Sequence, residues 1–280
     1  MDPSARTPGR DAQPGRRTSG TLPATGARIL AGMEMFLRSG RLAGGGFDHG
    51  FATRVGGRSA GPYASLSFGG PGDDPDAVEE NHRLLAAAAG FPRSDLRTVE
   101  QVHGGAVVLL DTLAPIPPGT RADALVATAP GLVPAVRTAD CVPLLLADPR
   151  SGRVAAVHAG WRGAWLRIPA AAVAELRACG SRPSDLIAAV GPAIGRCCYE
   201  VSDELASRFA AAFGPAVVTG RRLDLREVVR LQLFAAGIPA AAVEIVGGCT
   251  ACDPALHFSH RRDEGRTGRH LSFVRCRSLS

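Results

Sequence analysis

The sequence predicts a protein of the α+β class, with both strands and helices along the chain. Two apolar runs, 142–147 and 153–157, flank a turn rich in Asp, Pro and Gly, which predicts two strands joined as a hairpin. A helix is predicted over 77–89, because Asp74 provides an N-cap and Gly90 a terminator. Antiparallel strands beside separately capped helices indicate α+β.

The first predicted strand after the N-terminal region leads into a glycine-rich loop. Residues 51–70 combine glycines with small hydroxyl residues, so backbone N–H groups could approach an anion there, with Arg54 and Arg58 adding charge. A solvated turn with two surface arginines explains the same residues equally well. Residues 96–111 then predict a second hairpin, with His103 at its turn.

The remaining elements follow the same rules of period and punctuation. Residues 122–140 predict further strands, and 159–180 predict a glycine-bounded turn followed by a helix. Residues 185–200 predict a strand and a Gly-Pro turn, and two later helices are capped by Ser202 and Asp224. A strand, a polar loop and a last strand end the chain.

Cys141 directly precedes the first strand of the hairpin predicted over 142–157, and His158 directly follows the second. Because its strands are nearly equal in length, pairing would bring both side chains to the open end of the hairpin. A thiol and an imidazole there form either a nucleophile–base pair or two ligands of a metal site. His103 would be a third ligand if its loop lies close to them.

The seven cysteines are odd in number and unevenly spaced, and no convincing signal peptide precedes them. We therefore expect thiols in a reducing cytoplasm and no disulfide framework. Cys197 and Cys198 are adjacent, and successive side chains of an extended chain point in opposite directions. At least one of them is therefore expected to pack in the core.

Cys249-x-x-Cys252 followed by His257 and His260 has the ligand types of a zinc finger. Only four residues separate the two pairs, whereas a finger has about twelve or more. We therefore favour a loop that lines the functional site. The same loop would present three arginines to an anionic substrate, Arg261, Arg262 and Arg269.

Composition limits the classes of function. The 280 residues are 45% hydrophobic, and the net charge of +6 comes from arginine alone, since the chain has no lysine. Part of this positive charge lies in residues 1–44, a stretch rich in Gly, Pro, Ser and Thr. We predict that these residues form a flexible extension and that residues 45–280 form one domain. Met33 or Met35 could be the start of a shorter product. The chain has no basic stripe interleaved with aromatic residues, so nucleic-acid binding is not expected. It also has no run of 18 apolar residues, so a membrane span is not expected.

Seven ordered motifs after the extension resemble one known family. They are TRVGGRSAGPYASL, VEQVHGG, ADALVATAPG, TADCVPLLL, AVHAGWRG, GPAIGRCCYEV and CTACDPALHFSHRRDEGRTGR. The set is similar to the laccase-domain family, long labelled multicopper polyphenol oxidase and now regarded as purine nucleoside phosphorylases. The resemblance implies a four-layer α/β/β/α sandwich with mixed sheets.

The resemblance also implies a cytoplasmic, zinc-dependent enzyme. Its substrates would be adenosine, inosine, guanosine and S-methyl-5'-thioadenosine with phosphate, and adenosine deaminase activity would be linked to phosphorolysis. The family's catalytic zinc ligands match His103, Cys141 and His158. Arg54 and Arg162 lie in matched motifs beside them and are predicted to bind phosphate, because a guanidinium binds phosphate through two hydrogen bonds. The oligomeric state stays open.

Two other functions are compatible with these residues. Cys141 could be a nucleophile with His158 as its base, as in a hydrolase or amidase that edits peptidoglycan precursors. A copper polyphenol oxidase is disfavoured, because an axial methionine is expected near such copper and Met1, Met33 and Met35 all lie in the predicted extension. His103 distinguishes the first two functions, since only a metal site requires it as a ligand.

Overall fold

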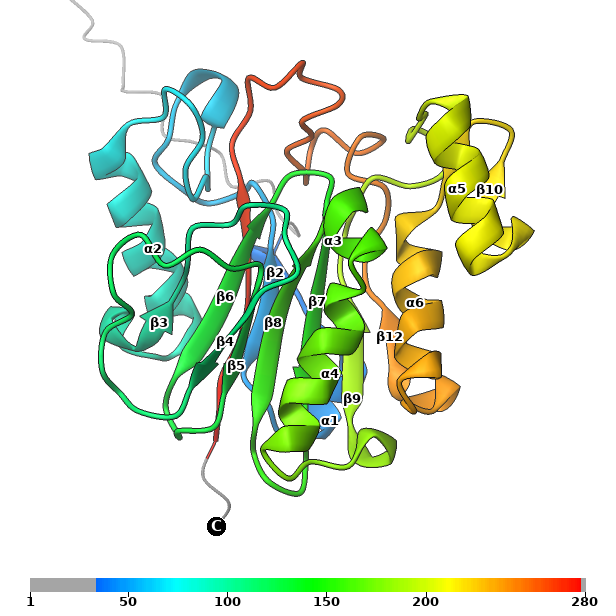
Figure 1. Ribbon diagram of the computed structural model, residues 1–280. Helices are drawn as coiled ribbons and strands as arrows, with labels where there is room; N and C mark the ends of the chain where they lie inside the picture. The colour runs from blue at the N-terminus through cyan, green and yellow to red at the C-terminus, as the bar shows by residue number, and fades with distance from the viewer. Residues whose placement is uncertain (1–33, 278–280) are drawn as a thin grey trace, which may run out of the picture. The chain divides into compact units, whose positions relative to one another are not determined.

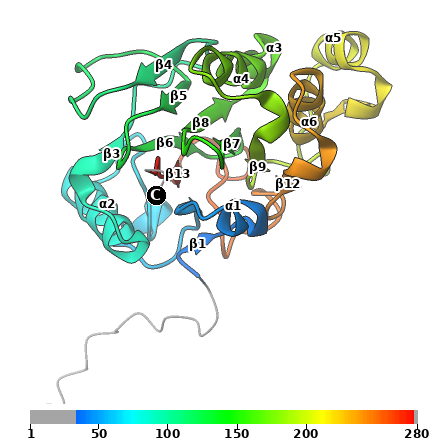
Figure 2. The same cartoon turned by 90° about the horizontal axis from the view of Figure 1, so that it is seen from below.

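Two β-sheets packed face to face form the centre of residues 34–277, the part of the chain that the computed structural model describes (Figures 1 and 2). The five-stranded sheet has the order β1 (Phe36–Leu37), β2 (His49–Ala52), β13 (His270–Val274), β6 (Val133–Thr138) and β3 (Leu96–Arg97). The six-stranded sheet has the order β12 (Val243–Ile245), β9 (Ile187–Val190), β7 (Val142–Ala147), β8 (Val154–Ala159), β5 (Ala124–Ala127) and β4 (Val107–Leu110). Both sheets contain parallel and antiparallel pairs.

Helices cover the outer face of each sheet (Figure 2). On the six-stranded sheet, α4 (Ile168–Ala178) and α6 (Leu225–Ala235) bury one large apolar cluster, and α3 (Trp161–Trp165) and α5 (Asp203–Phe213) add to it. On the five-stranded sheet, α2 (Pro75–Ala89) packs through Leu85 and Ala86. A third cluster, which includes Leu145 and Val136, fills the space between the sheets. These layers confirm the predicted α/β/β/α sandwich.

Local sequence signals place several elements correctly. Asp74 caps α2 by accepting from the Asp76 N–H, and Gly90 ends the helix at φ 76°. Strands β7 and β8 form the predicted antiparallel hairpin, with Leu145 opposite Ala156. The helix predicted within 159–180 is α4, preceded by the short α3.

Three predictions about element position are wrong in detail. The hairpin predicted over 96–111 does not form, because β3 and β4 belong to different sheets and His103 lies in the connection between them. His158 lies inside β8, opposite Pro143, and does not follow the strand. Structure begins before Gly45, since β1 pairs with β2 and α1 (Gly40–Gly44) follows it; the rest of the predicted extension, up to residue 33, lies outside the described residues.

Strand β1 explains why composition placed the start of the domain too late. Phe36 is 8% exposed and packs edge-to-face on Phe273, and Ser39 caps α1. These two short elements are held by tertiary contacts, which a polar and glycine-rich composition does not reveal. A two-stranded ribbon of β10 (Val218–Thr219) and β11 (Arg222–Leu223) completes the described strands. Within residues 34–277, no helix is both long and apolar enough to cross a membrane.

Candidate metal and substrate site

His103, Cys141 and His158 come together from three segments of the chain. One potential ligand atom of each residue lies within 4.8 Å of those of the other two. Cys141 Sγ is 3.8 Å from His103 Nε2, and the two imidazole rings are 4.7 Å apart between centroids, at 80° to each other. Strand β8 presents His158 beside the start of β7, which Cys141 precedes. The predicted three-residue group is therefore present as a geometric unit.

Asp123 organises this group from beneath, although no sequence argument selected it. Its buried carboxylate accepts from His158 Nδ1 at 2.7 Å. It also accepts from the backbone N–H groups of Val102, His103 and Gly104, at 3.2, 2.9 and 2.6 Å. Burial alone would raise the pKa of Asp123, but the hydrogen bonds from His158 and from the amides lower it. Asp123 therefore fixes both the ring of His158 and the loop that presents His103.

The Asp123 hydrogen bond also determines which nitrogen of His158 is available. With Nδ1 donating to the carboxylate, Nε2 is left to face Cys141 and His103. Burial would raise the pKa of the Cys141 thiol, but His158 and His103 lower it to about 6. Burial would lower the pKa of His158, but Cys141 and Asp123 raise it to about 9. The pair therefore favours a thiolate, which is the form that binds a metal or acts as a nucleophile.

A cavity of about 580 Å³ opens above the three residues, within the range of small-molecule sites. The loop from Gly69 to Pro71 forms part of its wall, and two aromatic residues, Trp161 and Tyr199, line it further along. Four arginines also line it, Arg137, Arg162, Arg261 and Arg269. Asp140 is its one lining carboxylate among the described residues, and it is already bonded to Thr250 and to the backbone of Arg261. The cavity therefore suits an anionic ligand that also carries an aromatic or apolar part.

The two arginines predicted to bind phosphate are placed differently. Arg162 lines the cavity, with its guanidinium carbon 4.9 Å from the centre of the Trp161 ring. Arg54 is not a lining residue: its Nε donates to the Ala64 carbonyl at 2.8 Å, and its guanidinium stacks on Phe258. The structure thus brings Arg162, but not Arg54, to the three potential ligands.

The C-terminal loop contributes some of the residues that the sequence indicated. Arg261 and Arg269 line the cavity together with His260, as a site-lining loop would. Arg262 does not, because it pairs with Asp263 at 2.8 Å. His257 is buried against His270, which rules it out as a partner of the Cys-x-x-Cys pair and agrees with the rejection of a zinc finger.

Two further residues shape the site and are not among those that the sequence predicted. Gly160 lies so close to the site that a Cβ there would be 2.9 Å from His103 Cδ2 and 3.0 Å from Cys141 Sγ. Only glycine fits at this position without moving these side chains. Arg137 is the penultimate residue of β6, and burial lowers its pKa. An arginine inside an apolar strand was a visible signal, as was the acidic Asp123 directly before the apolar run of β5.

The donor set fits a zinc ion. Two imidazoles and one thiolate are among the ligands that zinc prefers, and three protein ligands leave one position of a tetrahedral shell for water or substrate. The buried carboxylate–histidine hydrogen bond is the usual support of a metal-binding imidazole. His103, Cys141 and His158 would hold the ion.

The fold and the site define a four-layer α/β/β/α sandwich with a His–Cys–His group, which could hold a metal ion, at the base of an arginine-lined cavity. Residues 48–277 match the family described as Multi-copper polyphenol oxidoreductase laccase, and the chain belongs to that family.

Relatives and solved structures agree with this assignment. A protein of Deinococcus radiodurans named "Purine nucleoside phosphorylase" is 44% identical over 242 residues, which cover 85% of this chain and 91% of that protein. "Purine nucleoside phosphorylase YlmD" of Geobacillus stearothermophilus is 37% identical, with 85% and 93% covered. The crystal structure of YlmD from the same organism superimposes with a TM-score of 0.79 and 35% identity, over 88% of this chain and all of that one.

Proposed function

We propose that this protein is a zinc-dependent purine nucleoside phosphorylase. The observation that supports the proposal most directly is the convergence of His103, Cys141 and His158 at the base of a cavity lined by four arginines. The names of the relatives point to the same reaction. The proposed substrates are adenosine, inosine, guanosine and S-methyl-5'-thioadenosine, each with inorganic phosphate.

Phosphorolysis requires a phosphate oxygen to attack the anomeric carbon of ribose while the bond to the purine nitrogen breaks and the base leaves with the electron pair. The phosphate dianion must approach a site that already contains a thiolate, so guanidinium groups have to offset the repulsion. We assign this role to Arg162, with Arg137 and Arg269 as further cavity cations. Within the described residues, the guanidinium groups of Arg137 and Arg162 form no ion pair, so both are free to bind an anion.

Zinc, when bound, would supply a Lewis-acidic positive charge beside the reacting groups. The chain's own residues keep that position ordered. Asp123 orients His158 by accepting a hydrogen bond from its Nδ1. The same carboxylate accepts from the His103 amide and so fixes the loop that presents His103. The aromatic lining of Trp161 and Tyr199 offers faces on which a purine can stack. The linked deamination of adenosine is proposed for the same cavity; there a water attacks the purine carbon that carries the amino group, and the amino group leaves as ammonia.

The test uses protein purified without added metal and then analysed for metal. Adenosine is supplied with and without phosphate, and the products are separated by chromatography. Adenine and ribose 1-phosphate should form only with phosphate, whereas inosine, counted together with the hypoxanthine that its phosphorolysis gives, should form in both conditions. Zinc-replete protein that consumes no adenosine in either condition would refute the proposal.

A second candidate is a cysteine–histidine hydrolase, which the lowered pKa of Cys141 and the Asp123–His158–Cys141 arrangement favour. His103→Ala distinguishes the two. A hydrolase would retain much of its activity because the nucleophile and base remain, whereas the metal site would lose a ligand. Copper oxidase chemistry gains no support among the described residues, since Met35, the one methionine there, packs on the core beneath α2.

A further inference from the structure

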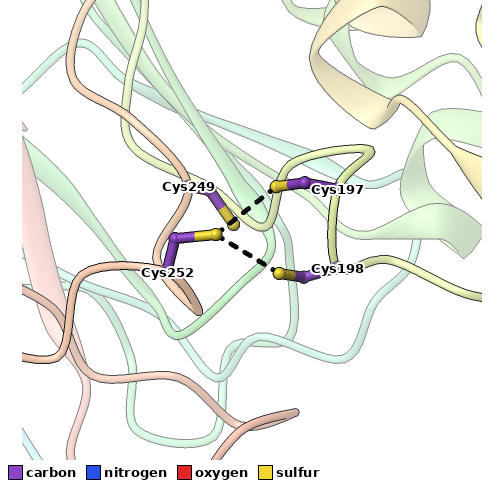
Figure 3. A group of neighbouring side chains, drawn as sticks. All are labelled: Cys197, Cys198, Cys249 and Cys252. Carbon is purple, nitrogen blue, oxygen red and sulfur yellow. Dashed lines mark hydrogen bonds between the residues drawn. The ribbon is translucent and has the colours of Figure 1, made fainter.

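A second group of cysteines lies on the six-stranded sheet, outside the His–Cys–His group. Cys197 and Cys198 come from the turn that follows β9, and Cys249 and Cys252 come from the loop that follows β12 (Figure 3). Strands β9 and β12 pair in parallel, so their C-terminal ends leave the sheet at the same edge. An additional bridge between Ala193 and Cys249 extends this pairing toward the cysteines.

The prediction that Cys197 or Cys198 packs in the core is therefore wrong. The alternation of side chains applies to extended chain, but residues 196–198 form a turn, so both thiols face the same partners. Cys252 Sγ lies 3.5 Å from Cys197 Sγ and 3.4 Å from Cys198 Sγ. All four sulfur atoms lie within 4.8 Å of one another.

These separations match the edges of a metal-centred tetrahedron. A Zn–S bond of about 2.3 Å implies S···S edges of about 3.8 Å in a regular tetrahedron. A disulfide requires about 2.05 Å, well below the observed contacts. The spacing is therefore that of four ligands around one ion, and the turns need only small shifts to reach it.

The backbone around Cys249 is arranged to stabilise a thiolate. Its Sγ accepts from the Gly195 N–H at 3.1 Å, and the amides of Ala251 and Cys252 also point toward it. A divalent cation would satisfy all four sulfurs at once.

We propose that Cys197, Cys198, Cys249 and Cys252 bind one zinc ion as a closed tetrathiolate site. Four protein sulfurs fill the tetrahedral shell and leave no position for substrate, so this site is structural, whereas the His–Cys–His group has an open position. Binding releases the thiol protons that remain at neutral pH and needs no oxidant.

The tetrathiolate site would brace one wall of the substrate cavity. Tyr199, which lines the cavity, directly follows Cys198. Between Cys249 and Cys252, Thr250 donates to Asp140 Oδ1 at 2.6 Å, and Asp140 precedes the ligand Cys141. A zinc ion that joins the two turns therefore fixes both a substrate-lining residue and the support of the other metal group.

The main experiment counts zinc in protein purified from cells without added metal, by elemental analysis against protein concentration. Wild-type protein should contain about two zinc ions per chain. Cys249→Ser/Cys252→Ser should contain one, and Cys141→Ser should lose the other. Cys179→Ser is the matched control, because Cys179 is a half-buried free cysteine outside both groups, and it should retain two.

A second measurement isolates the four-cysteine group by removing the other metal group. In the Cys141→Ser background, cobalt added in place of zinc should give the intense sulfur-to-cobalt absorption of a tetrahedral thiolate site. Alkylation should label Cys197 and Cys252 only after a chelator has removed the metal. One zinc in the wild type that Cys141→Ser abolishes, iron in place of zinc, or disulfides between these cysteines found by mass spectrometry would each overturn the proposal.

Discussion

Asp123→Asn tests whether the buried carboxylate beneath the metal group does more than hold the fold. The carboxylate accepts from His158 and His103 through Oδ1 and from Val102 and Gly104 through Oδ2. Asparagine retains one oxygen, so it can satisfy the Oδ1 donors. Its NH₂ group would then face the amides of Val102 and Gly104, leaving two partly buried donors without an acceptor.

The size of the effect follows from these contacts. An unsatisfied buried donor costs about 1–3 kcal/mol, and these two donors are partly buried, so the free energy of unfolding should fall by about 2–3 kcal/mol, from the lower part of that range. Loss of the negative charge behind His158 also weakens the imidazole as a ligand, and changes of this kind reduce metal affinity about 10–100-fold. Asp111→Asn, at an exposed carboxylate, should change neither quantity.

Urea denaturation of the metal-free protein measures the stability, and competition with a coloured chelator measures zinc affinity. The relevant zinc is the ion that Cys141→Ser also loses, which separates it from the tetrathiolate site. An Asp123→Asn protein that is destabilised but binds this ion as tightly as the wild type would refute a role of the carboxylate in zinc affinity. Asp123 would then support the loop without influencing His158.

The other predictions address the ligands, phosphate, acid stability and the N-terminal region. Alanine at either histidine ligand, or serine at Cys141, should abolish base release and deamination together; normal zinc content and turnover in His103→Ala would reject the three-ligand site. Arg162→Ala should raise the phosphate KM about 10–100-fold, because a charge-assisted hydrogen bond contributes about 1.5–3 kcal/mol, and should leave inosine formation nearly unchanged. Arg54→Ala is its control and should lower the melting temperature without a phosphate defect; a raised phosphate KM there would support the role predicted from the sequence. Burial lowers the pKa of His270 to about 3, whereas histidine in the unfolded chain has a pKa of about 6.5, so between these values the unfolded chain binds a proton that the folded chain does not. The free energy of unfolding should therefore fall by about 2 kcal/mol between pH 6.5 and 5 in the wild type and by less in His270→Gln, as measured by denaturation at each pH. Deleting residues 1–32, a polar stretch by composition, should leave activity and melting temperature unchanged, and a drop of several degrees would contradict this.

Signals that act over a few residues were sufficient to predict the local structure. The cap at Asp74 and the left-handed Gly90 define α2 by themselves, and the turn between β7 and β8 fixes their hairpin. The same hairpin brings Cys141 to His158. This part of the candidate site could therefore be predicted from spacing alone.

Pairing between distant segments could not be predicted in this way. The run 96–111 has two β-rich segments split by two glycines, as a hairpin would, yet β3 pairs with β6 and β4 pairs with β5 in the other sheet. The tetrathiolate group has the same origin. Its two halves are about 50 residues apart in the chain and meet only because β9 and β12 are parallel neighbours, which no local pattern reveals.

Asp140 shows how the structure maintains the geometry that these pairings create. It has φ 83°, a conformation that costs an ordinary residue about 1–2 kcal/mol, and it directs the following Cys141 toward the two histidines. Three hydrogen bonds offset that cost: its carbonyl accepts from Ile194, and its carboxylate accepts from Thr250 at 2.6 Å and from the Arg261 amide at 2.7 Å. Each bond comes from a segment that also lines the cavity or lies beside the cysteine turns. The orientation of the Cys141 thiolate therefore depends on the same loops that the second group of cysteines joins. Loss of metal from one site should lower the metal affinity of the other.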